Sequence, residues 1–530
     1  MAFSAACGAG GVRNGFAGVV EDGRVAVDFL CSCGNRHRAA AGRHGEQPVA
    51  VGVFADGGRV AETWVCPRTG ELGRGALSQI PLFYSVFNNS VRFSTDLGEL
   101  AGETAEPWPA AVAAALHGAV LPAPLTPYEN VFQLACGTTL TVAGGRERLD
   151  LAELDLAELA DRARRLAGRS GPVATLRCAL AYAGTAAQAG TAVLLGDGGG
   201  LGAAAIAAAC GGPVRRVHVH VDVPVLERRR TRLAPGTTVI DGTRSWLRAC
   251  SRTGPGYAHE ADPWPPGPEL LPGRVRLLSG RALVRALTGP PTGTGRLRTG
   301  WVRLAGAQPV PVLRGHRGRR VWLPAAAPTA EPPAPAGAGR DRLEPAGWMS
   351  QAARAARAPV SSADAGSHLV PAEGAGTTLG AVIDALESRP LSSRRPDGPE
   401  PVLVSAHPVV VGAIAHLALD GRLRRDLRGG HVDPVPLLRE LVPAGWRPSD
   451  TTPAERDKLF AAAFVTRRLA TAEQRARLLA RVESSPWIDA DRLKAVLADS
   501  RKVLFDAPAL HRLYVTAERY GEAMHTAVPQ

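Results

Sequence analysis

Lysine is nearly absent from this chain of 530 residues, which holds only Lys458, Lys494 and Lys502 although its formal net charge is +13. Arginine therefore carries the positive charge, and a sequence rich in Ala, Gly, Arg and Pro is typical of a GC-rich genome. The arginines are scattered, and no basic strip is interleaved with aromatic residues, so the sequence predicts no nucleic-acid partner. A basic groove for an acidic peptide or a nucleotide is the alternative.

Long apolar runs are absent as well. No stretch of eighteen apolar residues is present, which predicts that the chain has no membrane span. The N-terminal sequence MAFSAACGAGG lacks the basic region and the apolar stretch of a secretory signal. Hydrophobic residues make up 45% of the chain and charged residues 21%. These proportions predict a soluble globular protein, the length of 530 residues predicts about two or three domains, and the lack of a secretory signal predicts a cytoplasmic location.

The eight cysteines do not follow a standard zinc-binding spacing. Cys31 and Cys33 form a C-x-C pair near His37, which makes a zinc site one hypothesis, whereas buried or free thiols are the favoured interpretation. Cys178 and Cys210 lie in apolar helical segments and are expected to pack as small core residues.

The pattern of residues 14–66 predicts antiparallel strands and hairpins, because short alternating apolar runs are separated by Gly, Asp and Asn. The stretch IPLFYSVFNNSVRFST adds a further pair of strands, with Asn88 and Asn89 as turn residues. Residues 1–150 are therefore expected to form a β-rich domain.

The next part of the chain alternates between helices and strands. Residues 153–169 predict an amphipathic helix whose apolar side chains are Leu154, Leu156, Leu159 and Leu166. A helix, the strand TAVLLG, a glycine turn, the helix LGAAAIAAAC and another strand follow, and this alternation favours a parallel α/β layer. On the last strand His218, His220 and Asp222 share one face. A metal site is one hypothesis there, and a strand face in contact with polar loops is the favoured one.

Residues 323–347 are rich in Pro and Ala and predict a surface loop or linker. Helical segments follow, including the run ERDKLFAAAFVTRRLATAEQRARLLARVE and a helix that begins with Asp489 as its N-cap residue. The predicted fold class is α/β. An antiparallel β-rich domain is expected over residues 1–150, and a parallel-sheet domain with a helical C-terminal tail over residues 151–530.

Three stretches in chain order resemble the asparagine-synthetase family, in particular its branch of bacterial cyclases that close lasso peptides. GRGALSQIPLFYSVFNNSVRFSTDLGELAG resembles the end of the family's N-terminal domain, where P-L-Y-Y precedes a hairpin and F-(A/S)-S-E. PLTPYENVFQLACGTTLTV resembles the crossover segment, and TAVLLGDGGGLGAAAIAAAC occupies the place of V-x-L-S-G-G-x-D-S-S-A-I-A. PEPVLVSAHPVVVGAIAHL is a fourth, weaker match. The resemblance implies an Ntn-hydrolase-like glutaminase domain followed by an ATP-pyrophosphatase domain.

In the family, the first domain hydrolyses glutamine with an N-terminal cysteine whose own amino group serves as the base. Here residue 2 is Ala, and six residues precede Cys7, so this thiol would act only after processing or with a later start. The loop and strand that hold glutamine in the family have no equivalent in this chain. Cys7 is therefore expected to be structural, and the glutaminase-like domain to be degenerate.

The family's second domain binds ATP through backbone N–H groups, serines and an aspartate that holds Mg²⁺. The residues of this chain that fall on that loop are Asp197, Gly198, Gly199, Gly200 and Gly202. Gly202 stands in the place of the metal-binding aspartate, and Ala203 and Ala204 replace the serines. Asp197 could replace the lost ligand only in a rebuilt loop. The second metal segment is lost too, because residues 324–327 occupy the positions of T-G-x-G, so no metal site is predicted.

A lysine in a late K-x-x-(F/Y) segment of the family stabilises charge on the reacting carbonyl. Lys458 lies at the matching place in TTPAERDKLFAAAFV and is the candidate catalytic residue if the chain is a ligase. The alternative is a solvent-exposed helix residue beside Asp457.

The leading hypothesis is a degenerate asparagine-synthetase-like protein that acts as a binding or scaffold subunit in peptide natural-product biosynthesis. Its partner would be an active paralogue or a precursor peptide, in a homo- or heterodimer. The alternative is an active ATP-dependent ligase that forms amide bonds, as a lasso-peptide cyclase or an asparagine synthase does, with a rebuilt metal site. Only this alternative requires ATP and Mg²⁺.

Overall fold

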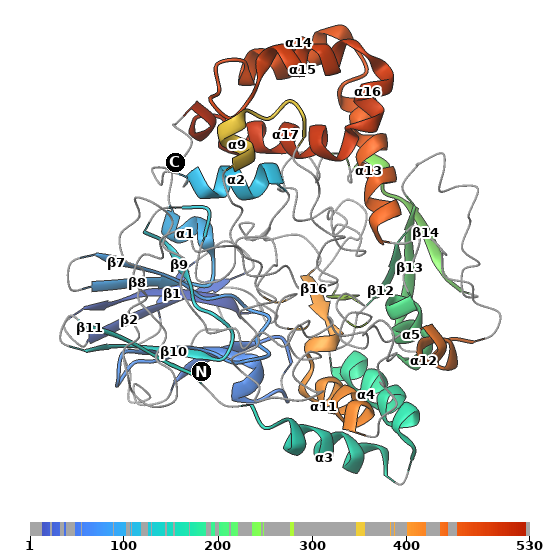
Figure 1. Ribbon diagram of the computed structural model, residues 1–530. Helices are drawn as coiled ribbons and strands as arrows, with labels where there is room; N and C mark the ends of the chain where they lie inside the picture. Colours follow the sequence, from blue (N-terminus) through green and yellow to red (C-terminus); the bar gives the residue numbers. More distant parts are fainter. Residues whose placement is uncertain are drawn as a thin grey trace.

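The computed structural model contains three β-sheets and a group of C-terminal helices within the part of the chain that it describes (Figure 1). The structure describes residues 13–21, 24–31, 36–38, 48–54, 56–87, 90–101, 107, 109–117, 126–128, 130–143, 146–151, 154–168, 170–186, 192–196, 201–210, 214–220, 236–244, 247, 276–279, 283, 346–355, 382, 386, 400–419, 435–443 and 453–525. None of the helices in these ranges is both long enough and apolar enough to cross a membrane.

The N-terminal part forms two antiparallel sheets, as the alternating apolar pattern predicts. The six-stranded sheet has the order β3-β2-β1-β8-β7-β9 and the five-stranded sheet the order β11-β10-β6-β5-β4. The strands of the first are β1 (Arg13–Glu21), β2 (Arg24–Cys31), β3 (Arg36–Arg38), β7 (Phe83–Phe87), β8 (Ser90–Ser94) and β9 (Phe132–Gln133). Those of the second are β4 (Val49–Gly52), β5 (Glu62–Cys66), β6 (Glu71–Arg74), β10 (Thr138–Ala143) and β11 (Arg146–Leu151).

The predicted strand pair around Asn88 and Asn89 is confirmed, because β7 pairs antiparallel with β8 up to Phe87 and Ser90, although the two asparagines lie outside the described residues. Between the two sheets an apolar core forms, since Phe16 of β1 and Leu72 of β6 belong to the same buried cluster. One short helix, α1 (Leu97–Ala101), follows β8.

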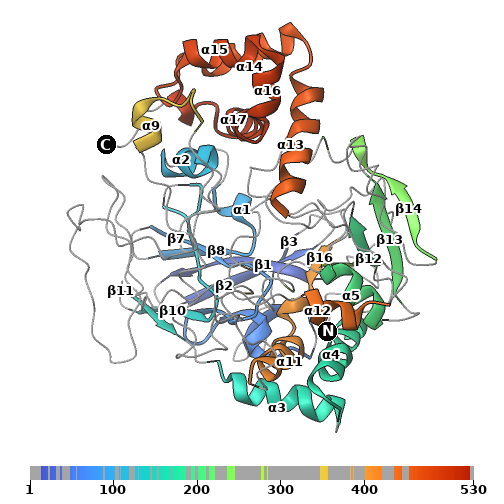
Figure 2. The same cartoon turned by 45° about the vertical axis from the view of Figure 1, so that its right-hand side comes forward.

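The third sheet has the order β14-β13-β12-β15-β16, and all its pairings are parallel (Figure 2). Its strands are β12 (Ala192–Gly196), β13 (Arg215–His220), β14 (Thr238–Asp241), β15 (Arg276–Ser279) and β16 (Glu400–Leu403). The chain therefore adds strands outward from β12 on one side, and then returns to add β15 and β16 on the other.

A group of helices lies beside this sheet, and α5 (Leu201–Cys210) packs directly on β12 and β15. α4 (Pro172–Ala186) and α12 (Val435–Leu441) pack on α5, and α3 (Leu156–Ala167) and α11 (Pro408–Leu419) pack on α4 and on each other. The amphipathic helix predicted over residues 153–169 is α3, and three of the four predicted leucines, Leu154, Leu156 and Leu159, pack on the core. Leu159 is buried together with Ala160 and Ala163, whereas Leu166 is 42% exposed. Small residues let α11 lie close to this side of α3.

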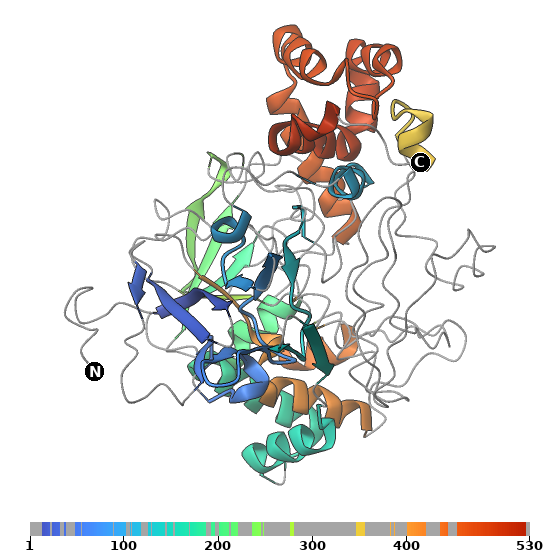
Figure 3. The same ribbon diagram turned by 90° about the vertical axis from the view of Figure 1, so that its left-hand side faces the viewer.

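The C-terminal helices form a separate group, which Figure 3 shows above the sheets. They are α13 (Pro453–Arg468), α14 (Ala472–Val482), α15 (Ala490–Ala498), α16 (Ser500–Phe505) and α17 (Ala507–Tyr520), joined by α2 (Pro109–His117) and α9 (Gln351–Ala355). The predicted helical tail is thus confirmed. Asp489 caps α15 as predicted, because its carboxylate accepts a hydrogen bond from the Arg492 N–H at 3.1 Å.

One predicted helical run is interrupted. The run from residue 455 to 483 is divided into α13 and α14, because Thr471 begins a new helix with a capping box. Its hydroxyl accepts from the Gln474 N–H at 3.2 Å, and the Gln474 side chain accepts from the Thr471 N–H at 3.1 Å. The sequence T-A-E-Q contains this signal.

The structure tests the predictions for the two helical cysteines, and it tests part of the prediction for the segment 323–347. Cys210 is buried as predicted, but Cys178 is exposed, because it faces outward from α4. Most of the segment 323–347 lies outside the described residues; of its last two residues, Ala346 is buried and Gly347 is exposed.

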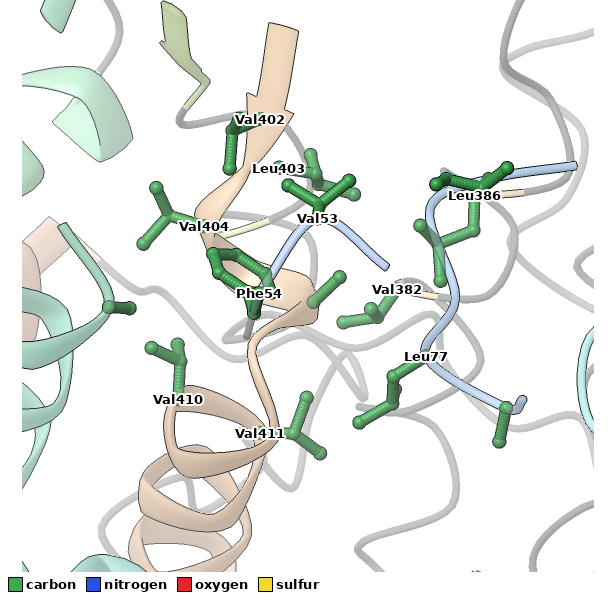
Figure 4. Packing of buried hydrophobic residues seen from close by; sticks show 14 of the residues in the cluster. Val53, Phe54, Leu77, Val382, Leu386, Val402, Leu403, Val404, Val410 and Val411 are labelled. Carbon is green, nitrogen blue, oxygen red and sulfur yellow. The ribbon is translucent and has the colours of Figure 1, made fainter. Parts of the chain in front are cut away.

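The N-terminal sheets and the α/β part share one apolar core. Figure 4 shows Val53, Phe54 and Leu77 of the N-terminal part packed with Val404 and Val410 of the α/β part. Side chains of the N-terminal part also form hydrogen bonds with backbone groups across the same junction. The Gln79 side chain donates to the Leu403 carbonyl at 2.9 Å and accepts from its N–H at 2.7 Å. The buried Arg74 guanidinium donates to the Leu386 carbonyl at 3.3 Å.

Candidate functional site

The order of the parallel sheet marks one place where a ligand site is expected. In open α/β sheets, ligands bind outside the carboxyl ends of the strands, where the direction of strand addition reverses. Here the reversal lies between β12 and β15. β12 ends at Gly196 and α5 begins at Leu201, so the predicted loop joins the two elements at this point. Asp197, Gly198, Gly199 and Gly200 themselves lie outside the described residues.

The first turn of α5 supplies no polar side chain to this place. Gly202 is buried, and Ala203 and Ala204, at the positions of the two serines in the resemblance, are each 6% exposed. All three belong to a helix that is apolar on every side and packs against α4 and α12 as well as the sheet. The described residues of this turn therefore do not fit a Mg²⁺ site, because that cation takes oxygen ligands.

The close packing of α5 continues at its far end. Cys210 donates a weak hydrogen bond to the Leu180 carbonyl of α4 at 3.7 Å, and burial raises the pKa of its thiol to about 11. A Cβ on Gly184 of α4 would stand 2.2 Å from the Cys210 sulfur. Only a glycine at position 184 lets the two helices approach this closely, so α5 is enclosed as a core helix.

Polar groups instead gather at the carboxyl ends of the next two strands. His220, the last residue of β13, is the register partner of Asp241, the last residue of β14. The Thr243 N–H donates to the Asp241 carboxylate at 3.0 Å, and the Gly242 N–H donates to the His220 carbonyl at 2.8 Å. The hydrogen bonds from Thr243, with smaller contributions from His220 and Arg244, lower the pKa of Asp241.

The sequence pattern indicates His220, but it does not indicate Asp241 or Thr243 as members of the same group. The available signal was an apolar strand that ends in D-G-T, since Asp before Gly often stabilises a turn through its own side chain. Reading that signal correctly requires knowing that β14 lies beside β13, which the local sequence does not specify.

The face of β13 that is predicted to carry His218, His220 and Asp222 differs in burial along the strand. His218 is buried and His220 is half-buried, while Val217 and Val219 on the opposite face pack with the C-terminal helices. Asp222 lies outside the described residues. Among the residues that the structure describes, no group of three or more His, Cys, Asp or Glu side chains is arranged to hold a metal ion.

Lys458 lies on α13 with its side chain exposed. At the other end of the same helix, Arg468 donates to the Leu247 carbonyl, beyond β14, at 3.5 Å. Within the described ranges no hydrogen bond or ion pair links Lys458 to His220 or Asp241. The structure therefore does not join the candidate lysine to the polar strand ends.

Predictions for the first cysteines are not addressed by the structure. Cys7 and Cys33 lie outside the described residues, and for Cys31 only the backbone, at the end of β2, is described.

Comparison of the chain with models of known protein families gave no match. Comparison with curated proteins gave none either. The resemblance to the asparagine-synthetase family therefore depends on the sequence motifs alone.

Proposed function

We propose that this protein is a degenerate member of the asparagine-synthetase family that acts as a binding or scaffold subunit in peptide natural-product biosynthesis. The observation that carries the proposal is the first turn of α5. At the reversal point of the parallel sheet, Gly202, Ala203 and Ala204 are buried in apolar packing, and they contribute neither a carboxylate nor a hydroxyl group. The partner would be an active paralogue or a precursor peptide, and the assembly a homo- or heterodimer in the cytoplasm.

The apolar packing also explains why such a fold would persist without its chemistry. Alanine and glycine in α5 allow close approach to β12 and β15, and each buried methylene-sized group contributes about 0.8 kcal/mol to stability. Replacing polar phosphate ligands with alanine removes the cost of burying unpaired polar groups when no nucleotide is bound. A subunit that is selected for assembly alone would gain stability from these substitutions.

One observation supports the alternative, an ATP-dependent ligase with a rebuilt metal site. Asp241 lies at the carboxyl edge of the same sheet, and its hydrogen bonds favour the ionised carboxylate, which is the form that binds Mg²⁺. In that case Asp241 would replace the carboxylate that is missing at Gly202, and Lys458 would stabilise the reacting carbonyl.

Calorimetry with the full chain distinguishes the scaffold proposal from the ligase alternative. For the scaffold we expect no magnesium-dependent heat of binding at millimolar ATP. Magnesium-dependent binding with a micromolar dissociation constant would contradict the scaffold proposal, and loss of that binding in Asp241→Asn would assign it to the rebuilt site. As a matched control, Asp491→Asn removes an exposed carboxylate on α15 and should leave any heat signal unchanged.

A further inference from the structure

Four polar side chains meet where the N-terminal sheets contact α3, α4 and α11. Asp56 lies in the connection between β4 and β5, Arg162 on α3, Tyr182 on α4, and His407 directly before α11. His407 Nε2 lies 3.3 Å from Asp56 Oδ1. Arg162 Nη2 lies 3.7 Å from Asp56 Oδ2 and donates to the Asp56 carbonyl at 3.1 Å. Segments that are 351 residues apart in sequence are thus joined by one imidazole.

The hydrogen bonds of His407 define its protonation state. The Val409 N–H, in the first turn of α11, donates to His407 Nδ1 at 3.2 Å, so Nδ1 must carry a lone pair. Nε2 faces a carboxylate oxygen and therefore carries the hydrogen. The neutral imidazole uses both nitrogens. A second proton would have to sit on Nδ1, where it would face the Val409 N–H and break that bond.

The surroundings of the ring oppose a positive charge overall. His407 is fully buried, and its ring packs edge-to-face against Phe54 at 4.5 Å and Tyr182 at 5.6 Å. Burial lowers the pKa of His407, Asp56 partly offsets this, and the Arg162 guanidinium adds to the lowering. Burial would raise the pKa of Asp56, but the interactions with Tyr182 and His407 outweigh it and hold that pKa below its ordinary value. Asp56 therefore stays ionised while His407 becomes protonated.

We propose that His407 is a pH-sensitive latch between the N-terminal sheets and α11. As the neutral imidazole it holds the Asp56 segment through Nε2 and the first turn of α11 through Nδ1. Acidification protonates Nδ1, releases Val409 and loosens the start of the helix that packs between α3 and α4. The charged and titratable groups that face the ring are Asp56 from the β4–β5 connection, Arg162 from α3 and Tyr182 from α4. The described first turn of α11 adds none.

The direction of the effect follows from proton linkage. Because the pKa of His407 is lower in the folded chain than its ordinary value of 6.5, the unfolded or unlatched form binds the proton more readily. The stabilisation is complete above about pH 6.5 and is lost as the pH falls toward the folded pKa. Over that interval each pH unit lowers the equilibrium constant for the latched form by up to about tenfold.

Hydrogen exchange followed by mass spectrometry tests the latch in the full chain. After correction for the intrinsic pH dependence, peptides that cover Val409–Val411 should lose up to about tenfold of their protection between pH 7.5 and pH 5.5. Peptides from α17 serve as an internal reference and should not change. Unchanged protection at Val409 across this range would overturn the proposal, and this measurement needs no variant.

Two variants make the test specific to the imidazole. His407→Asn keeps an acceptor near the place of Nδ1 but cannot titrate, so the pH-dependent change in protection should disappear. His511→Asn, at another buried histidine on α17, should keep the full change and is the matched control. If His407→Asn retains the wild-type pH dependence, the proposal is wrong. If that variant does not fold, the wild-type exchange at Val409 decides the question.

Discussion

Gly412 of α11 lies against the backbone carbonyl of Leu159 on α3, so closely that a Cβ at position 412 would stand 2.0 Å from the carbonyl oxygen. The obstacle is backbone, which cannot rotate away as a side chain can. This contact allows α11 and α3 to pack with their axes close together, and it lies in the core that joins both parts of the chain.

Gly412→Ala should therefore destabilise the protein by about 1–3 kcal/mol or more, because the added methyl group forces the two helices apart. The measurement is the free energy of unfolding in urea. Gly347→Ala is the control, since a Cβ there meets nothing within 4 Å, and its effect should stay within about 0.5 kcal/mol. Equal effects of the two substitutions would show that the close approach is not important.

Gln79 and Gln133 are both buried, but we expect their substitution by Met to affect the stability of the protein in opposite ways. Gln79→Met should cost about 2 kcal/mol, because it leaves the buried N–H and carbonyl of Leu403 without their partners. Within the part of the chain that the structure describes, neither amide atom of Gln133 has a hydrogen-bond partner. Gln133→Met should thus be neutral or stabilising. Denaturant midpoints of both variants test the contrast, and a larger loss for Gln133→Met would contradict it.

The four described cysteines should differ in reactivity. Brief alkylation of the native protein at pH 8, followed by peptide mapping, should label the exposed Cys178, whereas Cys136 and Cys210 should react only after unfolding. For Cys210 both burial and a pKa raised to about 11 oppose thiolate formation. Burial would raise the pKa of Cys66 too, but hydrogen bonds with Thr69 lower it below its ordinary value, so Cys66 should be labelled early. Prompt labelling of Cys210 in folded protein would refute this assignment.

Substitution of Lys458 should have different effects under the scaffold proposal and under the ligase alternative. If the chain is a scaffold, Lys458→Ala should change the free energy of unfolding by less than about 0.5 kcal/mol and leave the turnover of an active partner intact, because its side chain is exposed. If the chain is a ligase, the same substitution should lower turnover by about 10²-fold or more. Product formation by the assembled complex is measured, with sizing chromatography to show that the variant still assembles. Lys494→Ala, an exposed lysine on α15, is the matched control.

Local patterns predicted local structure well. The strands around β7 and β8, the helices α3, α4 and α5, and the cap at Asp489 all follow from periodicity and from side chains that act within four residues. The errors are also local in origin. Helical spacing predicts Leu166 on the buried side of α3, but Gly168 ends the helix two residues later and Leu166 is exposed.

The polar groups at the candidate sites could not be predicted from local sequence patterns, because their partners come from distant segments. Asp241 becomes notable only when β14 lies next to β13, and His407 only when it meets Asp56. Nothing in the sequence around either residue indicates the partner. By contrast, the absence of carboxylates and hydroxyls near Gly202 is visible in sequence, and the structure adds that Ala203 and Ala204 are buried.

The shared core has a consequence for the synthesis of this protein. Gln79 and the Leu403 backbone that it bonds are 324 residues apart, so the N-terminal sheets leave the ribosome long before their apolar partners exist. At about 5–20 residues per second, this interval lasts roughly 15–65 seconds. During that time Val53, Phe54 and Leu77 would lie uncovered on a nascent chain. We therefore expect the emerging N-terminal half to depend on a chaperone that shields this surface until α11 has been made.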